Sequence, residues 1–361
     1  MVFRHKFPKT KSNYVNIQVV AFEELFLWGN VADKAIICYT QERKAMKKDT
    51  AEKRLEACND VFADIFDNLL FGGNQVIDQN NLHALPTESF SRKMDGGIRQ
   101  GFRDIVKECG NLGQYHLICG IENQTEIDNT MPERIMGYDY AAYEEQIRNL
   151  CRQNQEERTP AYAKRLLDGQ KVAPVITVVL YYGTKEAWES PLRLHDMLDF
   201  PTEVEAIIKP YVADYTINVI DVSRLTEETR KRLKSDFRLI ADYLVYKNKP
   251  EQLKQFMNEN GHKICHPEEF LDVMSEVASD GRYKRIKEQV LQRVEKKGEL
   301  TMCIIAEELE NKGIELGRIQ EAIEAFQECE RSWEDTYARI ILKFSLSEEE
   351  ANGYMEKYWC K

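Results

Sequence analysis

The stretch LICGIENQTEID, residues 117–128, combines the pattern of a buried strand with a charged end. Its apolar run reaches Glu122, and Gln124 follows two positions later, so both side chains project from one side of an extended strand. Asn123 projects from the other side. A carboxylate at the rim of a buried strand is costly unless something pairs with it. We therefore expect Glu122 to bind either a structural partner or a metal ion.

A second acid lies in the segment that we expect to pair with this strand. Asp104 belongs to RQGFRDIVKE, residues 99–108, and the turn ECGNLG separates that segment from GQYHLICGIENQ, residues 113–124. Because the turn lies midway between Asp104 and Glu122, a hairpin would bring their carboxylates together. Mg²⁺ prefers a few oxygen ligands plus water. The pattern thus predicts a metal site formed by Asp104 and Glu122.

The neighbouring groups suit hydrolysis of a phosphodiester. The backbone carbonyl of Asn123 would add a further oxygen ligand, and the Gln124 amide would hold a water or a phosphate oxygen. A site of this composition can generate a nucleophilic water and neutralise the charge of a phosphate in the transition state.

The order of elements around the hairpin predicts an α/β fold. An amphipathic helix over residues 54–71 precedes the strands, and Pro132 opens a helix that runs to about residue 153. VAPVITVVLYYG, residues 172–183, is rich in β-branched residues and reads as a central strand, and YTINVIDV, residues 215–222, reads as another. We expect a mixed sheet flanked by helices over residues 46–225 and a separate helical region over residues 226–361.

The composition is that of a globular protein. Of the 361 residues, 43% are hydrophobic and 31% are charged, and the net charge is -11. The sequence contains no apolar run long enough to cross a membrane. Its nine dispersed cysteines are typical of reduced thiols in a cytoplasm. Residues 1–45 fit none of the expected elements, and we interpret them as an extension without a role in the chemistry.

Four blocks of the sequence resemble a known family. Asp104, the Glu122-Asn123-Gln124 triplet, the helix MPERIMGYDYAAYEEQI and the strand PVITVVLYYG occur in the order typical of the Rpn group of recombination-promoting nucleases and YhgA-like transposases. The helix ACNDVFADIFDNLLF also resembles the opening helix of that group, and the resemblance extends over residues 50–355. The group is part of the PD-(D/E)XK nuclease superfamily, so the resemblance implies a restriction-endonuclease-like fold.

The resemblance also implies an activity. It implies a Mg²⁺-dependent DNA endonuclease, with Mn²⁺ as a substitute ion, that acts in recombination or mobile-element biology in a bacterial cytoplasm. Its catalytic residues would be Asp104, Glu122 and Gln124. The superfamily usually has lysine where Gln124 stands, and glutamine offers only neutral hydrogen bonds, so we expect slow catalysis.

Three further residues are candidates for supporting roles. Asp64 lies on the opening helix, where the superfamily often places a third acid, but the helical wheel puts it opposite the apolar stripe, and this favours a solvated face. Arg134 and Tyr138 lie one turn apart on the second helix and could contact a DNA phosphate. Asp139 lies near the apolar stripe of the same helix, where a structural hydrogen bond is favoured over catalysis.

A reading without catalysis stays open. The α/β core could be a degenerate nuclease fold that only binds DNA or a protein. Basic clusters such as TRKRLK at 229–234 and RYKRIK at 282–287 would form either solvated faces or the rim of a DNA site. A homodimer through the C-terminal helices would place two sites on one duplex.

Overall fold

The computed structural model describes residues 51–92, 98–111, 115–156, 165–278 and 281–359. The contacts divide the chain into Met1–Asp49 and Thr50–Lys361, and the description that follows concerns the second unit. The extension that we expect over residues 1–45 lies outside the described residues.

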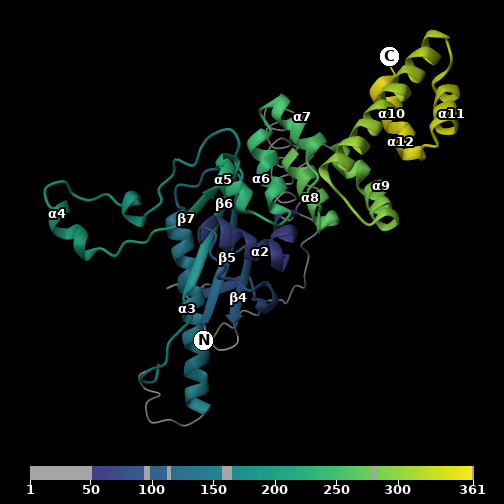
Figure 1. Ribbon diagram of the computed structural model, residues 1–361. Coiled ribbons are helices and arrows are strands. Elements are labelled where there is room, and N and C mark those ends of the chain that lie inside the picture. The colour runs from purple at the N-terminus through teal and green to yellow at the C-terminus, as the bar shows by residue number, and fades with distance from the viewer. Residues whose placement is uncertain (1–50, 93–97, 112–114, 157–164, 279–280, 360–361) are drawn as a thin grey trace, which may run out of the picture. The chain divides into compact units, whose positions relative to one another are not determined.

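The centre of the structure is a five-stranded mixed sheet, which confirms the predicted α/β class (Figure 1). The spatial order is β1-β4-β5-β6-β7, with β1, β4 and β5 antiparallel and β5, β6 and β7 parallel. The strands are β1 (Leu82–Ala84), β4 (Ile105–Asn111), β5 (Tyr115–Gln124), β6 (Val175–Tyr181) and β7 (Asn218–Asp221). A separate hairpin contains β2 (Glu88–Arg92) and β3 (Ile98–Phe102).

The structure divides the first predicted strand in two. β3 pairs with β2 in the small hairpin, whereas β4 joins the main sheet, so the chain bends at Arg103 and Asp104. β4 then pairs with β5 from Ile105 opposite Ile121 to Asn111 opposite Tyr115, as the predicted hairpin requires. β6 is central, and its residues Val178–Tyr181 are buried.

Helices cover both faces of the sheet. α3 (Met131–Glu156) begins beside Pro132 as predicted, and its residues Met131 and Ile135 pack against Val179 of β6. α2 (Asn59–Ile65) and its π-helical continuation η2 (Phe66–Leu70) pack on the other face, where the main hydrophobic cluster lies. Along β5, alternate side chains therefore face either α3 or the α2 side.

The C-terminal half of the chain is helical. Three short elements lie between β6 and β7: η5 (Leu194–Met197), α4 (Glu205–Ile208) and η6 (Lys209–Tyr211). The short helix η7 (Val222–Arg224) follows β7, and η3 (Gln79–Asn81) precedes β1. The helices that follow are α5 (Glu227–Arg232), α6 (Phe237–Tyr246), α7 (Pro250–Glu259), α8 (Pro267–Ala278), α9 (Gly281–Lys297), α10 (Met302–Glu328), α11 (Trp333–Phe344) and α12 (Glu348–Tyr358). No helix among the described residues is both long and apolar enough to span a membrane.

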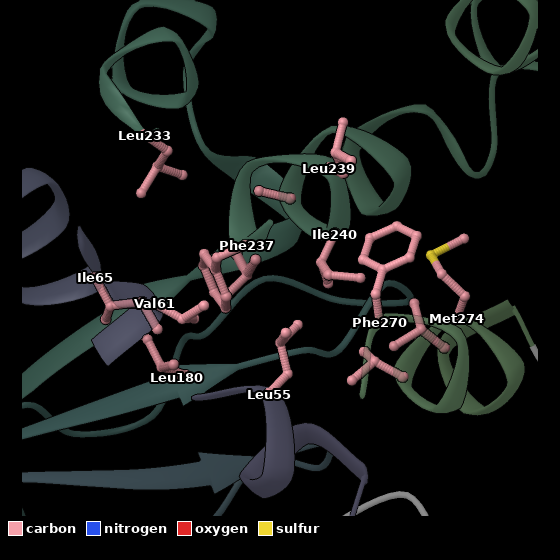
Figure 2. Packing of buried hydrophobic residues seen from close by; sticks show 14 of the residues in the cluster. Leu55, Val61, Ile65, Leu180, Leu233, Phe237, Leu239, Ile240, Phe270 and Met274 are labelled. Atoms are coloured by element: carbon pink, nitrogen blue, oxygen red, sulfur yellow. The ribbon is translucent and has the colours of Figure 1, made fainter. Parts of the chain in front are cut away.

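One hydrophobic cluster joins the sheet to the C-terminal helices. Leu180 of β6, Phe237 of α6 and Phe270 of α8 belong to it, and Figure 2 shows several of its members together. The cluster thus crosses the boundary that we predict at residue 225. A smaller cluster, which includes Ile323, Ile340 and Met355, lies between α10, α11 and α12.

This shared core predicts that the sheet and the helices unfold together. Phe237 is 1% exposed and its ring meets that of Tyr182 edge-on, with centroids 6.4 Å apart. We expect Phe237→Ala to lower the free energy of unfolding by about 3–5 kcal/mol, because it removes a buried aromatic ring and leaves a cavity. Urea unfolding followed by circular dichroism measures the loss.

The control for this substitution is Leu342→Ala, since Leu342 is 82% exposed. We expect that change to cost less than about 0.5 kcal/mol. Two separate unfolding transitions, with only one of them shifted by Phe237→Ala, would contradict a shared core.

Candidate functional site

Asp104 and Glu122 lie at the same end of the β4–β5 pair. Ile105 pairs with Ile121, so Asp104 stands one residue beyond the ladder, at the level of Glu122. The Asp104 carboxylate accepts a hydrogen bond from the backbone N–H of Asn123, with 2.7 Å between Oδ2 and N. The hairpin therefore brings the first predicted acid to the residue that follows the second.

Asp104 also pairs with a cation that the sequence did not reveal. Lys53 Nζ lies 2.8 Å from Asp104 Oδ1, and the Lys53 side chain is 31% exposed. Lys53 belongs to the helical segment 51–56, which precedes α2. The contact joins residues 51 positions apart in the chain, and no local motif marks it.

Glu122 is held by Arg134, a residue of α3. Its side chain is 4% exposed, and Arg134 Nη2 of α3 lies 2.5 Å from its Oε1 atom. Gln124 Nε2 donates a longer hydrogen bond to the same oxygen, at 3.4 Å. The expected convergence of Glu122 and Gln124 on one side of β5 is thus present. Arg134, which we expected at a DNA phosphate, binds Glu122 in this structure.

Arg134 and Tyr138 form one small cluster in the first turns of α3. The Arg134 guanidinium also lies 2.8 Å from Asp128 Oδ2 and 3.5 Å from the Tyr138 hydroxyl. Burial and the nearby Glu122 charge raise the pKa of Tyr138 above its ordinary value. Tyr138 therefore stays a neutral hydroxyl beside Glu122 at neutral pH, where it can donate a hydrogen bond.

Asn123 points to the α2 side, away from Glu122. Its Nδ2 donates to Glu56 Oε2 at 2.7 Å, and the Tyr182 hydroxyl donates to the other oxygen of the same carboxylate. Burial, followed by the charge of Glu56, raises the pKa of Tyr182 well above its ordinary value. Glu52 and Glu56 are each 1% exposed, so this face of the site carries two buried acids that sequence reasoning missed.

Asp64 has a structural role, and the predicted solvated face is wrong. It is 8% exposed and accepts hydrogen bonds from the backbone N–H groups of Lys234 and Ser235, at 2.9 and 2.8 Å. The Ser235 hydroxyl donates to it as well, at 2.7 Å. Its neighbour Asp67 likewise accepts from the backbone at Val76 and Ile77. The distant loop at Lys234 and Ser235 and the nearby segment at Val76 and Ile77 thus cover these acids, and a helical wheel cannot show that.

Asp139 also belongs to a buried network. Arg103 Nη2 lies 2.8 Å from Asp139 Oδ1, and the hydroxyl of Thr177 donates to the same oxygen at 2.6 Å. Tyr215 donates to its second oxygen. The network joins α3 to β6 and agrees with the structural hydrogen bond that we expected at Asp139.

The donor chemistry of the Asp104–Glu122 pair fits a hard divalent ion. Both ligands would be carboxylate oxygens, which Mg²⁺ prefers. Among the described residues, no group of three or more histidine, cysteine, aspartate or glutamate side chains is arranged to hold a metal. An ion here would therefore rest on two carboxylates, a main-chain oxygen such as that of Asn123, and water, which is usual for Mg²⁺. Lys53 and Arg134 now neutralise these carboxylates, so an ion would compete with both cations.

Comparison with known proteins identifies one relationship. A family model described as "Putative transposase, YhgA-like" matches residues 75–264, which is more than half of the chain. The match includes the whole hairpin and the start of α3. No curated protein and no solved structure matches the chain.

The role of Asp64 gives a prediction that separates stability from chemistry. We expect Asp64→Ala to lower the free energy of unfolding by about 2–4 kcal/mol, because it leaves two buried N–H groups and a buried hydroxyl without their acceptor. The activity per folded molecule should not change. Urea unfolding measures the first quantity, and DNA nicking at a temperature well below the transition measures the second. Loss of nicking in a fully folded Asp64→Ala protein would restore Asp64 as a catalytic candidate.

Proposed function

The chain belongs to the YhgA-like transposase family, and from this premise we propose that it is a metal-dependent DNA endonuclease. Family membership indicates a function related to mobile elements. The hydrolysis of DNA is the step that the site supports. One observation carries the proposal: Asp104 and Glu122 lie at the same end of the β4–β5 ladder, where the Asp104 carboxylate reaches the backbone N–H of the residue after Glu122.

The proposed roles follow from the contacts of each side chain. Asp104 and Glu122 would hold Mg²⁺, with the Asn123 carbonyl as a further oxygen ligand. When bound, the ion would supply Lewis acidity and lower the pKa of a bound water. The Gln124 amide lies beside Glu122 and can donate a hydrogen bond to that water or to a phosphate oxygen. The backbone N–H of Asn123 fixes the direction of the Asp104 carboxylate.

Two cations at the site suit a polyanionic substrate. Lys53 and Arg134 are each 31% exposed, and each pairs with one of the two acids. In the basic cluster at 229–234, the Arg230 side chain is 6% exposed and pairs with Asp242 at 2.6 Å, so it is not available to a phosphate. Lys231 is 64% exposed and pairs with Glu227 on the surface.

A second candidate function is binding without hydrolysis. The observation that favours it is the same pair of cations, since a nuclease fold that has lost its metal would need them to neutralise its buried acids. In that case the module would bind DNA or a protein through its exposed surface. Dimerisation through the C-terminal helices stays a prediction for either function.

Plasmid nicking separates the two functions. We expect the purified protein to convert supercoiled plasmid to the nicked form with Mg²⁺ or Mn²⁺, and EDTA to stop the reaction. Asp104→Asn removes one charge from the ion site but retains an acceptor for the Asn123 N–H, so the fold should persist. The nicking rate should fall at least roughly 100-fold, because several kcal/mol of charge stabilisation are lost.

The matched control is Glu228→Gln, which removes a carboxylate whose side chain is 88% exposed. That variant should nick like the wild type. Equal rates for the wild type and Asp104→Asn would remove the enzymatic proposal and leave the binding module.

A further inference from the structure

Arg134 joins the proposed catalytic acid to a second carboxylate. The two terminal nitrogens of Arg134 contact different carboxylates: Nη2 lies 2.5 Å from Glu122 Oε1, and Nη1 lies 2.8 Å from Asp128 Oδ2. Glu122 is nearly buried, whereas Arg134 and Asp128 are 31% and 27% exposed. The guanidinium thus lies at the mouth of the site, with one nitrogen directed inwards.

Asp128 is a firm anchor for this arginine. The backbone N–H and the hydroxyl of Thr130 donate to Asp128 Oδ1, at 2.8 and 2.7 Å. Burial raises the pKa of Asp128, but the hydrogen bonds from Thr130 and Arg134 outweigh it, and the net pKa lies below the ordinary value. Asp128 therefore stays ionised at neutral pH, and it can retain Nη1 whether or not Nη2 contacts Glu122.

A buried pair between α3 and the bend before β4 provides a comparison with a purely structural contact. The side chains of Arg103 and Asp139 are 4% and 7% exposed, and Thr177 and Tyr215 complete the ligands of Asp139. Both oxygens of Asp139 therefore have buried partners. The Arg134–Glu122 contact has an open side, and its arginine has an alternative anion in reach.

We propose that Arg134 exchanges partners during the reaction: it is the counterion of Glu122 before the metal binds and a ligand of the DNA phosphate afterwards. This inference rests on the proposed endonuclease function and assigns to Arg134 the coupling between metal and DNA binding at that site. A divalent cation bound to the Glu122 carboxylate would repel the guanidinium at such short range and weaken its hold on Oε1. Metal binding would therefore release Nη2 while Nη1 stays on Asp128.

The released nitrogen favours DNA as its next partner. A guanidinium N–H that leaves a carboxylate needs another anionic acceptor, and a phosphate oxygen matches its geometry. Because Glu122 and a phosphate compete for the same Nη2, metal binding should increase the affinity for DNA. The exchange thus predicts that metal and DNA each raise the affinity of the other.

The first test measures metal affinity without any reaction. We expect Arg134→Gln to bind Mn²⁺ about five- to tenfold more tightly than the wild type, if Arg134 holds Glu122 in about 80–90% of the molecules. Electron paramagnetic resonance of free Mn²⁺ during a titration gives the dissociation constants. The matched control is Arg148→Gln, because Arg148 lies on the same helix with a 54% exposed side chain that pairs only weakly with Glu144, at 3.4 Å. It should bind Mn²⁺ like the wild type.

The second test measures DNA affinity. We expect Ca²⁺, used as a hard cation, to strengthen the binding of a fluorescent duplex by the wild type and by Arg148→Gln. Arg134→Gln should lose most of that increase. Fluorescence anisotropy at constant ionic strength measures the three affinities with and without the ion.

The outcomes of the Mn²⁺ titration test the exchange of partners separately from the proposed endonuclease function. Equal Mn²⁺ affinities for Arg134→Gln and the wild type would overturn the exchange of partners and leave the endonuclease proposal intact. Absence of Mn²⁺ binding by both proteins would overturn the proposed function together with the exchange.

If Arg134→Gln does not fold by circular dichroism, Arg134→Lys serves instead, since lysine keeps the charge but lacks a fork that can bridge two carboxylates. Its Mn²⁺ affinity should exceed that of the wild type, and an equal affinity would count against the exchange.

Discussion

The antiparallel register of β4 and β5 is the constraint on which the site depends. Opposition of Ile105 and Ile121 fixes Asp104 at the level of Glu122, and a slip of one residue would move every side chain of β5 to the other face of the sheet. Buried residues on both faces prevent such a slip, because Ile121 packs towards α2 while Ile118 packs on the α3 side. The hydrophobic core therefore sets the geometry of the charged site.

The same alternation explains why the acids need cations from two directions. Glu122 and Asn123 are adjacent, yet they contact Arg134 on the α3 side and Glu56 on the α2 side. Asp104, at the bend before β4, is held by the segment 51–56 through Lys53. The end of the hairpin is thus enclosed by one helical segment on each face. Each segment supplies one positive charge to a chain whose net charge is -11.

The sequence predicted those features that depend on local pattern. The hairpin, the start of α3 beside Pro132 and the central position of β6 follow from periodicity and turn chemistry within short windows. Features that depend on distant contacts were not accessible. Lys53 reaches Asp104 across 51 positions, and Lys234 lies 170 positions from Asp64. A helical wheel compares a helix only with itself, so it could not place the loop that buries Asp64. The bend at Asp104 was missed for a similar reason. β3 is distinct from β4 because it pairs with β2, and that pairing cannot be read from the segment 99–108 alone.

Three buried carboxylates on this scaffold illustrate how an acid can be either fixed or exchangeable. Asp64 is satisfied by neutral N–H and O–H donors, and Asp139 is satisfied by a guanidinium enclosed by two hydroxyls. Neither arrangement leaves room for a competing cation without unpairing buried groups, which is expensive. Glu122 differs because its cation is partly exposed and has Asp128 as an alternative anion. The metal site that we propose at Glu122 would require this third arrangement, because an ion could then compete with Arg134 for the carboxylate without leaving the guanidinium unpaired.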